Sequence, residues 1–444
     1  MLNFENRTGP LLNDAPTYPE REIPLWFRDA KLGFFIHWGI YSVPAWATSL
    51  APPTSSPRDA YAYHQYAEWY ANTLRISGSP TQRWHEEHYG VGTSYEDLAR
   101  LWKPDEFDPS TLVDTLVGAG GRYLIPTTKH HDGFCLWDTA TTSFTSVQRG
   151  PRRDLVRELH DAARTARLRF GVYFSGALDW HASGFGPIES DHELFENRRN
   201  DERFARYASS QLEELIDAFH PDVVWNDIDW PDAGKGTEPW ALAGLLSRYY
   251  DQVPDGVVND RWGIPFHGFV TREYSHVPDA MSSYWEATRG TGLSFGWNRN
   301  ESEERLLTAD ALIRFLVDVV SKNGNLLLNI GPNAAGHIPV AQEKLLGALG
   351  EWLSTNGEAI YATRTWQRFG DEERHTRFTV ASDGEVYVHA LEPSVGVVQI
   401  PTELVGRRVR WLGADGSSEA RADSSLMIPD RLRRSSVAVA GFMP

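Results

Sequence analysis

The hydrophobic pattern of residues 1–357 alternates between short apolar runs and longer amphipathic segments. Each apolar run is rich in β-branched and aromatic residues and ends in glycine or polar residues, a pattern typical of buried strands. We therefore expect a strand in each of these runs. They occupy residues 32–39, 122–131, 169–176, 222–227, 256–260 and 325–332.

The amphipathic segments between these runs show helical spacing. In residues 310–324, Leu312, Leu316 and Val319 fall on one face of a predicted helix. We expect Gly324 to end this helix, because glycine readily adopts the left-handed conformation found after helix termini. Similar stripes predict helices in residues 108–121, 152–168 and 207–219.

Strands that alternate with helices form βα units, whose strands pair in parallel. The number of predicted units favours a closed (β/α)8-like barrel over an open doubly wound sheet. No glycine-rich phosphate loop follows the first predicted strand, which also argues against a dinucleotide-binding fold. Residues 358–444 instead show short alternating strands with Asp-Gly and similar turns, which predict an antiparallel β-sandwich. We thus expect two domains, a barrel in residues 1–357 and a small β-sandwich in residues 358–444.

The charge of the chain narrows its range of partners. Its formal net charge is −17, from 43 Lys and Arg against 60 Asp and Glu. Nucleic acids and anionic membrane surfaces bind clustered positive charge, so we expect neither as a partner. No apolar run approaches the ~20 residues of a membrane-spanning helix, and the N-terminus lacks the pattern of a signal peptide. We expect a soluble, cytoplasmic protein, and the sequence does not specify an oligomeric state.

Aromatic residues are abundant, with 17 Trp, 17 Tyr and 20 Phe, and many tryptophans lie beside polar residues. Examples are "IHWG" (36–39) and "WNDIDW" (225–230). A single tryptophan is usually a core residue, but a set beside His, Asp and Glu also suits a sugar, which offers both apolar faces and hydroxyls. The single cysteine, Cys135, excludes an intramolecular disulfide, and we expect it to be a buried structural thiol rather than a nucleophile.

Polar side chains stand where the predicted strands end. In a parallel barrel, functional groups collect at these C-terminal strand ends and in the loops that follow them. A barrel built only for stability would not need polar residues at the end of so many strands, so the set predicts a functional site. Its members are His37, His130, His131, Asp132, Tyr173, Ser175, Asn226, Asp227, Asn259, Asp260 and Arg261.

A metal-dependent hydrolase is the first class of site that this set suggests. Barrel strands in such enzymes often present a histidine pair and an aspartate to zinc. However, His131 and Asp132 are neighbours and would point to opposite sides of a strand. No His-x-His pair or other spacing typical of metal ligands is present. We therefore expect no metal.

A glycosidase is the second class. It needs two carboxylates, one ionised as the nucleophile and one kept protonated to assist the leaving group. Asp227 fits the first role, because it ends a predicted central strand between two tryptophans. The residues alone leave Asp229 and Asp260, near the same strand ends, as alternatives for this role, and the structural interpretation of both is a salt bridge, in the case of Asp260 with Arg261. Composition alone does not choose the second carboxylate among Glu68, Glu273 and Glu286.

Long motifs then decide between these classes. They follow one another in order: "WFRDAKLGFFIHWGIYSVPAW" (26–46), "AEWY" (67–70), "TTKHHDGFCLWDT" (127–139), "VVWNDIDWP" (223–231), "VVNDRWG" (257–263), "TREY" (271–274) and "SKNGNLLLNIGPNAAGHIP" (321–339). These strings resemble glycoside hydrolase family 29, the retaining α-L-fucosidases, and its bacterial members in particular. The resemblance runs over nearly the whole barrel region, whereas residues 358–444 resemble the family only in architecture.

The resemblance implies an exo-acting α-L-fucosidase that removes terminal fucose from oligosaccharides or glycoconjugates with retention, without a metal or organic cofactor. It places Asp227 at the nucleophile position and Glu273 of "TREY" at the general acid/base position. The fucose pocket that the resemblance implies consists of His37, Glu68, Trp69, His130, His131, Tyr173, Trp225, Arg261 and Phe295.

Three alternatives stay open. One is a sibling specificity, such as an α-L-galactosidase or a narrow α-1,3/4-fucosidase. Another is a catalytically silent fucose-binding protein, which the presence of both candidate carboxylates argues against. The third is Glu286 of "YWEATRG" as the second carboxylate in place of Glu273. We expect Glu286 to bond a barrel arginine rather than to act in catalysis.

Overall fold

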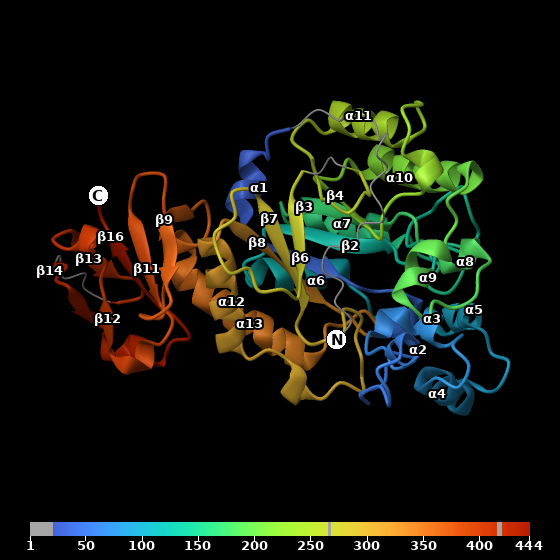
Figure 1. The fold of residues 1–444 in the computed structure, drawn as a ribbon, viewed down its shortest axis with the longest axis horizontal. Helices are drawn as coiled ribbons and strands as arrows, with labels where there is room; N and C mark the ends of the chain where they lie inside the picture. The colour runs from blue at the N-terminus through green and yellow to red at the C-terminus, as the bar shows by residue number, and fades with distance from the viewer. Residues whose placement is uncertain (1–20, 265–267, 415–419) are drawn as a thin grey trace.

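The computed structural model describes residues 21–264, 268–414 and 420–444. Its first part is an eight-stranded parallel sheet, hydrogen-bonded in the order β5-β4-β3-β2-β1-β8-β7-β6 and curled into a barrel (Figure 1). This confirms the predicted (β/α)8-like barrel. The strands are β1 Leu32–Ile36, β2 Tyr123–Lys129, β3 Arg169–Ser175, β4 Val223–Asp227, β5 Val257–Val258, β6 Val270–Glu273, β7 Trp285–Gly290 and β8 Gly324–Ile330.

The barrel has a seam between its edge strands, β5 and β6. The two segments meet where the Phe269 amide donates to the Val258 carbonyl (3.1 Å). Within the described residues, no helix follows β5 or β6. The barrel therefore departs here from the full (β/α)8 pattern.

The hydrophobic pattern of the sequence did not predict two strands, β6 and β7. Their sequences are "VTRE" and "WEATRG", which contain arginine and glutamate instead of an apolar run. Glu273 of β6 and Glu286 of β7 contact other polar groups inside the barrel. A hydrophobicity pattern does not detect a strand whose inward residues are polar.

Alternate residues of the strands face the barrel interior. Phe35, Tyr173 and Trp225 belong to the apolar cluster that fills this interior, whereas Phe34 packs in the cluster between the sheet and its helices. Because successive side chains of a strand point to opposite faces, Asp227 shares the inward face of Trp225, two residues earlier. The strand periodicity thus places a carboxylate inside the barrel at the C-terminal end of β4.

Helices cover the outside of the sheet. One of them, α10, begins after Asp201, whose carboxylate accepts from the Phe204 amide (3.1 Å) as an N-cap. It ends at His220, which has a left-handed φ of 45°. The covering helices are α6 Pro109–Gly118, α7 Leu155–Thr165, α10 Glu202–Phe219, α11 Leu242–Gln252, α12 Ala309–Ser321 and α13 Val340–Asn356.

Shorter helices gather at the C-terminal ends of the strands, on the right of Figure 1. They surround the side of the barrel where the sequence predicts the site. These helices are α2 Pro57–Ala62, α3 Tyr70–Thr73, α4 Pro80–Tyr89, α5 Tyr95–Leu98, α8 Trp180–Ser183 and α9 Asp191–Glu196.

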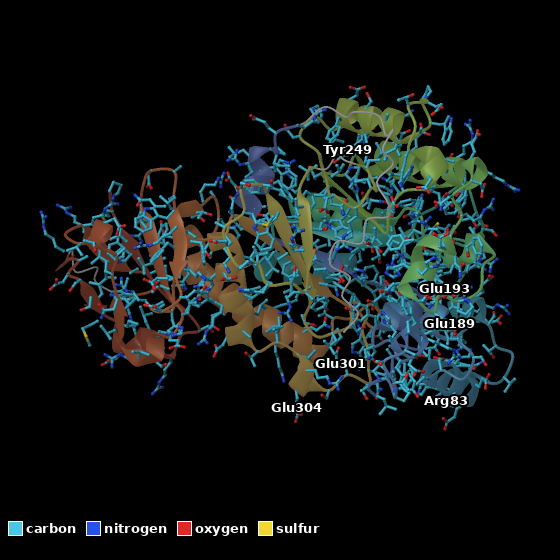
Figure 2. All side chains as sticks on the ribbon, viewed as in Figure 1. Arg83, Glu189, Glu193, Tyr249, Glu301 and Glu304 are labelled. Carbon is cyan, nitrogen blue, oxygen red and sulfur yellow. The ribbon has the colours of Figure 1, made fainter. Side chains whose placement is uncertain are left out.

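At the opposite end of the barrel, Tyr249 of α11 connects the N-terminal ends of β4 and β5 by hydrogen bonds. Tyr249 is labelled in Figure 2. Its hydroxyl lies within hydrogen-bonding distance of the carbonyls of Pro221 (3.0 Å) and Val257 (3.3 Å). Helix α1, Leu25–Ala30, adds Phe27 to the interior cluster. Packing and hydrogen bonds therefore close this end of the barrel.

The expectation that Gly324 ends a helix is wrong. Helix α12 ends at Ser321, and Asn323 takes the left-handed conformation with a φ of 71°. Gly324 is instead the first residue of β8. A Cβ atom at this position would lie 2.5 Å from the indole of Trp285, so close approach rather than helix termination requires the glycine.

The residues beyond α13 form the predicted antiparallel sandwich. A six-stranded sheet in the order β14-β13-β16-β11-β10-β9 faces the two-stranded sheet β12-β15. In β16, Ala440 and Phe442 pack toward this small core, while Val439 packs toward the barrel. The strands are β9 Arg364–Asp371, β10 Thr376–Val380, β11 Val386–Ala390, β12 Val397–Gln399, β13 Arg408–Trp411, β14 Ala420–Arg421, β15 Ser425–Met427 and β16 Ala438–Phe442.

The sandwich packs against α12 and α13, on the left of Figure 1 and away from the short helices of the strand ends. Arg377 forms an ion pair with Asp318 of α12 (2.7 Å), and the Trp352 indole of α13 donates to the Val437 carbonyl (2.9 Å). Through these contacts the domain supports the barrel. The domain boundary after residue 357 stays a prediction.

The role of Gly324 can be measured through stability. We expect Gly324→Ala to lower the free energy of unfolding by ~1–3 kcal/mol, because the new methyl group overlaps a buried indole. Gly347→Ala in α13 is the control, since nothing beyond its chain neighbours and its own helix backbone lies within 4 Å of its Cβ position, and it should stabilise the helix by up to ~1 kcal/mol. Chemical denaturation measures both changes. Equal effects of the two substitutions would contradict the steric explanation.

Candidate active site

Three charged side chains meet at the C-terminal ends of β4 and β6. Asp227 ends β4, Glu273 ends β6, and Arg261 lies in the segment after β5. Arg261 Nη1 donates to Asp227 Oδ1 and Nη2 donates to Glu273 Oε2, each over 2.9 Å. The side chains of Asp227 and Glu273 are 12% and 11% exposed. One guanidinium therefore bridges two carboxylates that solvent still reaches.

The guanidinium of Arg261 is itself held in place. Its Nε donates to Thr271 Oγ1 (3.0 Å), and the Thr271 hydroxyl donates to Asp260 (2.7 Å). Its central carbon lies 4.7 Å from the ring centroid of Trp225, a cation–π distance. Asp260 thus acts on Arg261 through Thr271, and the expected salt bridge is replaced by this chain of hydrogen bonds.

Asp227 accepts two further hydrogen bonds. The hydroxyl of Tyr173, on the neighbouring strand β3, donates to Oδ2 (2.8 Å), and the Ile228 amide donates to Oδ1 (2.9 Å). Tyr173 reaches Asp227 because β3 and β4 pair in parallel with Tyr173 opposite Trp225. All of these donors favour the ionised carboxylate.

The environment shifts the pKa values of the two carboxyl groups in opposite directions. Burial alone would raise the pKa of Asp227, but Arg261, His131 and Tyr173 together hold this pKa below its usual range. Burial raises the pKa of Glu273, and the negative charge of Asp227 adds to this against the opposing effect of Arg261. The two pKa values are therefore moved apart, in the directions that a nucleophile and a general acid require.

Three histidines line the interior next to Asp227. The His130 ring stacks on Tyr173, with centroids 5.6 Å apart, and contacts the His37 ring at 5.5 Å. His131 Nε2 lies 3.6 Å from Asp227 Oδ2. Burial lowers the pKa of His37 to about 3 and that of His131 to about 4, and it holds the pKa of His130 well below its usual range. These rings are neutral near pH 7, where they serve as hydrogen-bonding groups.

The tautomer of His131 follows from its neighbours. Its Nδ1 lies 2.6 Å from Ser175 Oγ, and the Ser175 hydroxyl donates to the Leu178 carbonyl (2.6 Å). Because a hydroxyl has a single hydrogen, the proton between His131 and Ser175 belongs to Nδ1. The Nε2 atom that faces Asp227 is then a free acceptor, suited to a hydroxyl of a bound ligand.

Glu68 and Trp69 come from the insertion after β1. Glu68 accepts from the amides of Phe295 (3.3 Å) and Gly296 (2.8 Å), so it holds the loop that carries the Phe295 ring. Burial raises the pKa of Glu68 to about 7. Trp69 packs edge-on against His131, with centroids 5.6 Å apart. Glu301, labelled in Figure 2, accepts from the Leu293 amide (2.7 Å) and braces the same loop.

The structure brings together the catalytic and sugar-binding residues that the family resemblance implies. Phe295 contacts His37 at 5.0 Å, so residues from the segment after β1 and from the loop after β7 meet in one group of contacting side chains. Their individual roles stay predictions. The members are His37, Glu68, Trp69, His130, His131, Tyr173, Trp225, Asp227, Arg261, Glu273 and Phe295.

Asp229 and Glu286, two further carboxylates near the site, are bound to protein side chains. Asp229 pairs with Arg198 (2.8 Å) and Lys235 (3.0 Å), which confirms it as a salt-bridge residue. The prediction that Glu286 bonds a barrel arginine is wrong. Glu286 accepts from the Tyr123 hydroxyl (2.5 Å) and the Trp225 indole (3.0 Å) inside the barrel, because the inward face of β7 meets aromatic residues there.

Asn329 is a site residue that the sequence analysis missed. Its Oδ1 lies 2.6 Å from His37 Nδ1, and its Nδ2 donates to the Phe295 carbonyl (2.6 Å). The side chain therefore fixes the His37 ring relative to the Phe295 loop. A detectable signal was present, because Asn329 interrupts the apolar run of the fully buried strand β8.

Within the described ranges, no three His, Cys, Asp or Glu side chains converge in the manner of metal ligands. Cys135 is buried, and this burial raises the pKa of its thiol well above the usual range. A protonated thiol is a poor nucleophile. Cys135 therefore packs as the structural residue that the sequence analysis expects.

Comparison with known proteins places this site in a family. Residues 9–358 match the profile of the family described as "Alpha-L-fucosidase". The chain is 33% identical over 423 residues to the tissue α-L-fucosidase of Rattus norvegicus, covering 91% of this chain and 84% of that protein. The chain belongs to the α-L-fucosidase family. It is also 32% identical over 401 residues to the α-L-fucosidase of Dictyostelium discoideum, covering 86% of this chain and 82% of that one.

Solved structures of the family share this architecture. The α-fucosidase of Thermotoga maritima is 43% identical, with a TM-score of 0.85, and the match covers 95% of this chain and 97% of that one. The same enzyme solved in complex with fucose gives the same identity, TM-score and coverage. The barrel and the sandwich therefore both belong to the family fold. Among the described residues of this fucosidase, no helix is long and apolar enough to cross a membrane.

Proposed function

We propose that Asp227 and Glu273 are the catalytic carboxylates of an exo-acting, retaining α-L-fucosidase. The observation that carries this proposal is the Arg261 bridge, which holds both carboxylates at 2.9 Å while their pKa values shift in opposite directions. Retaining glycosidases need such a pair at a separation of ~5–5.5 Å. The membership of the chain in the α-L-fucosidase family supports the sugar.

In the first step, the Asp227 carboxylate attacks the anomeric carbon of fucose while the Glu273 carboxyl group protonates the departing oxygen. Arg261 and the Tyr173 hydroxyl keep Asp227 ionised before the attack. In the second step, Glu273 removes a proton from water, whose oxygen attacks the anomeric carbon. The bond from this carbon to Asp227 breaks, which releases fucose and the Asp227 carboxylate. The glycosidic oxygen leaves on one face and water enters on the same face, so the configuration is retained.

Specificity for fucose is proposed to rest on neutral polar groups and one apolar wall. His37, His130 and His131 are uncharged and offer donors and acceptors to the sugar hydroxyls. The Trp225 indole already packs against Tyr173 at 5.6 Å and Arg261 at 4.7 Å, and Trp225 is 2% exposed whereas Phe295 is 7% exposed. Phe295 is therefore the better candidate for the wall against the C6 methyl group. A hydroxymethyl group at that wall would lose its hydrogen bonds to water.

The substrate class that we propose is a terminal α-L-fucosyl residue on an oligosaccharide or glycoconjugate. The Thermotoga maritima enzyme solved with fucose, which is similar over 95% of this chain, supports a fucosyl pocket. Location in the cytoplasm also stays a proposal, to which the single cysteine of the chain is suited because a reducing compartment maintains free thiols.

The nucleophile is tested by chemical rescue. Asp227→Gly should reduce release of p-nitrophenol from p-nitrophenyl α-L-fucoside by more than about a thousandfold, because no group remains to attack the anomeric carbon. Added azide occupies the space of the lost carboxylate and should restore part of the rate. The expected product is β-fucosyl azide, which NMR identifies. Full activity of the variant without azide would contradict the assignment. Wild-type turnover of the α-L-galactoside in preference to the fucoside would favour the sibling specificity.

The Arg261 bridge predicts a change in the pH profile of kcat/KM. The guanidinium stabilises the ionised forms of both carboxylates, so its removal should raise the pKa of Asp227 and that of Glu273. The acid limb, where Asp227 becomes protonated, and the basic limb, where Glu273 loses its proton, should both move to higher pH in Arg261→Met. Arg261→Lys keeps the charge and serves as the control, with limbs close to those of the wild type. Limbs that move in opposite directions in Arg261→Met would show that the cation does not link the pair.

A further inference from the structure

The backbone directly after the proposed nucleophile is strained. Ile228 has a φ of 50° and Asp229 a φ of 72°, so two consecutive non-glycine residues adopt the left-handed conformation. This conformation is especially unfavourable for a β-branched residue such as Ile228. Strain of this kind costs ~1–3 kcal/mol per residue and persists only where surrounding contacts impose it. The turn therefore needs an anchor.

The side chain of Asp229 provides this anchor. Its oxygens pair with Arg198 Nη2 (2.8 Å) and Lys235 Nζ (3.0 Å), and the three side chains are at most 2% exposed. Asp229 Oδ1 also accepts from the Trp230 amide (2.7 Å), and Arg198 Nη1 donates to the Ile228 carbonyl (3.3 Å). The buried Asp229 carboxylate thus holds the Trp230 amide, and its partner Arg198 holds the Ile228 carbonyl of the strained turn.

The turn after Asp227 is also bound to the backbone segment that contains Arg261. Asn226 Nδ2 donates to the carbonyls of Asp229 (2.9 Å) and Arg261 (2.8 Å), so one amide ties the two backbones together. Gly263 has a φ of 67°, and a Cβ atom there would lie 1.8 Å from Asp229 Oδ1. The Asp229 carboxylate thus lies directly between the turn after Asp227 and the segment after β5.

We propose that Asp229 is a positioning residue of the reaction, which acts through the turn and does not touch the substrate. Its pairs with Arg198 and Lys235 hold the strained turn so that the Asp227 carboxylate meets both the Arg261 guanidinium and the anomeric carbon. The proposal rests on the assignment of Asp227 as the nucleophile. Loss of the anchor lets the turn relax and withdraws Asp227 from the position of attack. An offset of ~1 Å in such a group can cost about a hundredfold in rate.

The opposite end of the same strand offers a matched control. Asp222 immediately precedes β4, is buried, and pairs with two arginines, Arg164 (2.9 Å) and Arg169 (2.6 Å). Like Asp229, it is a buried carboxylate with two cationic partners, although these arginines are 38% and 43% exposed, and it lies at the N-terminal end of the strand, away from the site. Asp229→Asn and Asp222→Asn therefore each remove one buried, paired carboxylate, and only the first change is expected to affect the turn.

The test measures covalent inactivation by 2-deoxy-2-fluoro-fucosyl fluoride, which accumulates the fucosyl–enzyme bond at the nucleophile. In Asp229→Asn we expect the inactivation rate constant to fall about a hundredfold, while the Kd for fucose changes less than about threefold. Asp222→Asn should be inactivated at the rate of the wild type even though it is less stable. All measurements are made at a temperature at which circular dichroism shows each variant to be folded.

The possible outcomes separate this proposal from the proposed function. Inactivation of Asp229→Asn at the wild-type rate would overturn the positioning role, as would equal slowing in Asp222→Asn. Peptide mapping of the wild type that finds the label on a residue other than Asp227 would instead overturn the nucleophile assignment. If Asp229→Asn does not fold, Lys235→Met replaces it, because it removes one cation and leaves the Arg198 pair. That variant should show slower inactivation of the same kind, and an unchanged rate would again reject the proposal.

Discussion

The bridge that Arg261 forms between Asp227 and Glu273 is the constraint on which the rest of the active site depends. Two carboxylates close enough to act on one glycosidic bond repel each other, and a cation at 2.9 Å from both offsets that repulsion. The cation does not make the two groups equivalent. Asp227 also has the Tyr173 hydroxyl as a donor, whereas Glu273 has burial and the charge of Asp227 against ionisation. The unequal surroundings shift the pKa values of two carboxyl groups in opposite directions, which suits the proposed roles of nucleophile and acid.

The seam of the barrel makes this bridge possible. Strand β5 is two residues long, and within the described residues no helix follows β5 or β6, so Arg261 lies in irregular backbone between the strands that end in Asp227 and Glu273. Irregular backbone needs other contacts to define it. Here the Thr271–Asp260 chain, the Asn226 amide and the buried Asp229 pairs supply them.

The sequence predicted those parts of the fold in which local pattern and tertiary environment agree. The strands with apolar runs, the βα alternation and the sandwich were found in this way. Strands β6 and β7 were not, because their inward residues Glu273 and Glu286 are polar and buried for chemical and structural reasons that hydrophobicity does not encode. Gly324 was assigned to a helix end because its real constraint, the Trp285 indole, comes from a distant segment.

The site, like the fold, was only partly predictable from the sequence. The polar strand ends and the family motifs together selected residues whose side chains the structure brings into contact, but they did not predict the geometry of the Arg261 bridge. Nothing in the sequence shows that one guanidinium binds both carboxylates, that Glu286 bonds Tyr123 and Trp225, or that Asn329 orients His37. These contacts join residues far apart in the chain, and only the closed barrel places them together.

The stereochemistry of the first-formed product tests the central claim most directly. Hydrolysis of p-nitrophenyl α-L-fucoside by the wild-type enzyme can be followed by proton NMR at early times, before the released sugar mutarotates. Double displacement by Asp227 and Glu273 predicts that α-L-fucose appears first and that the β anomer accumulates only later. Appearance of β-L-fucose as the initial product would mean a single displacement by water, and would contradict the assignment of Asp227 as the nucleophile.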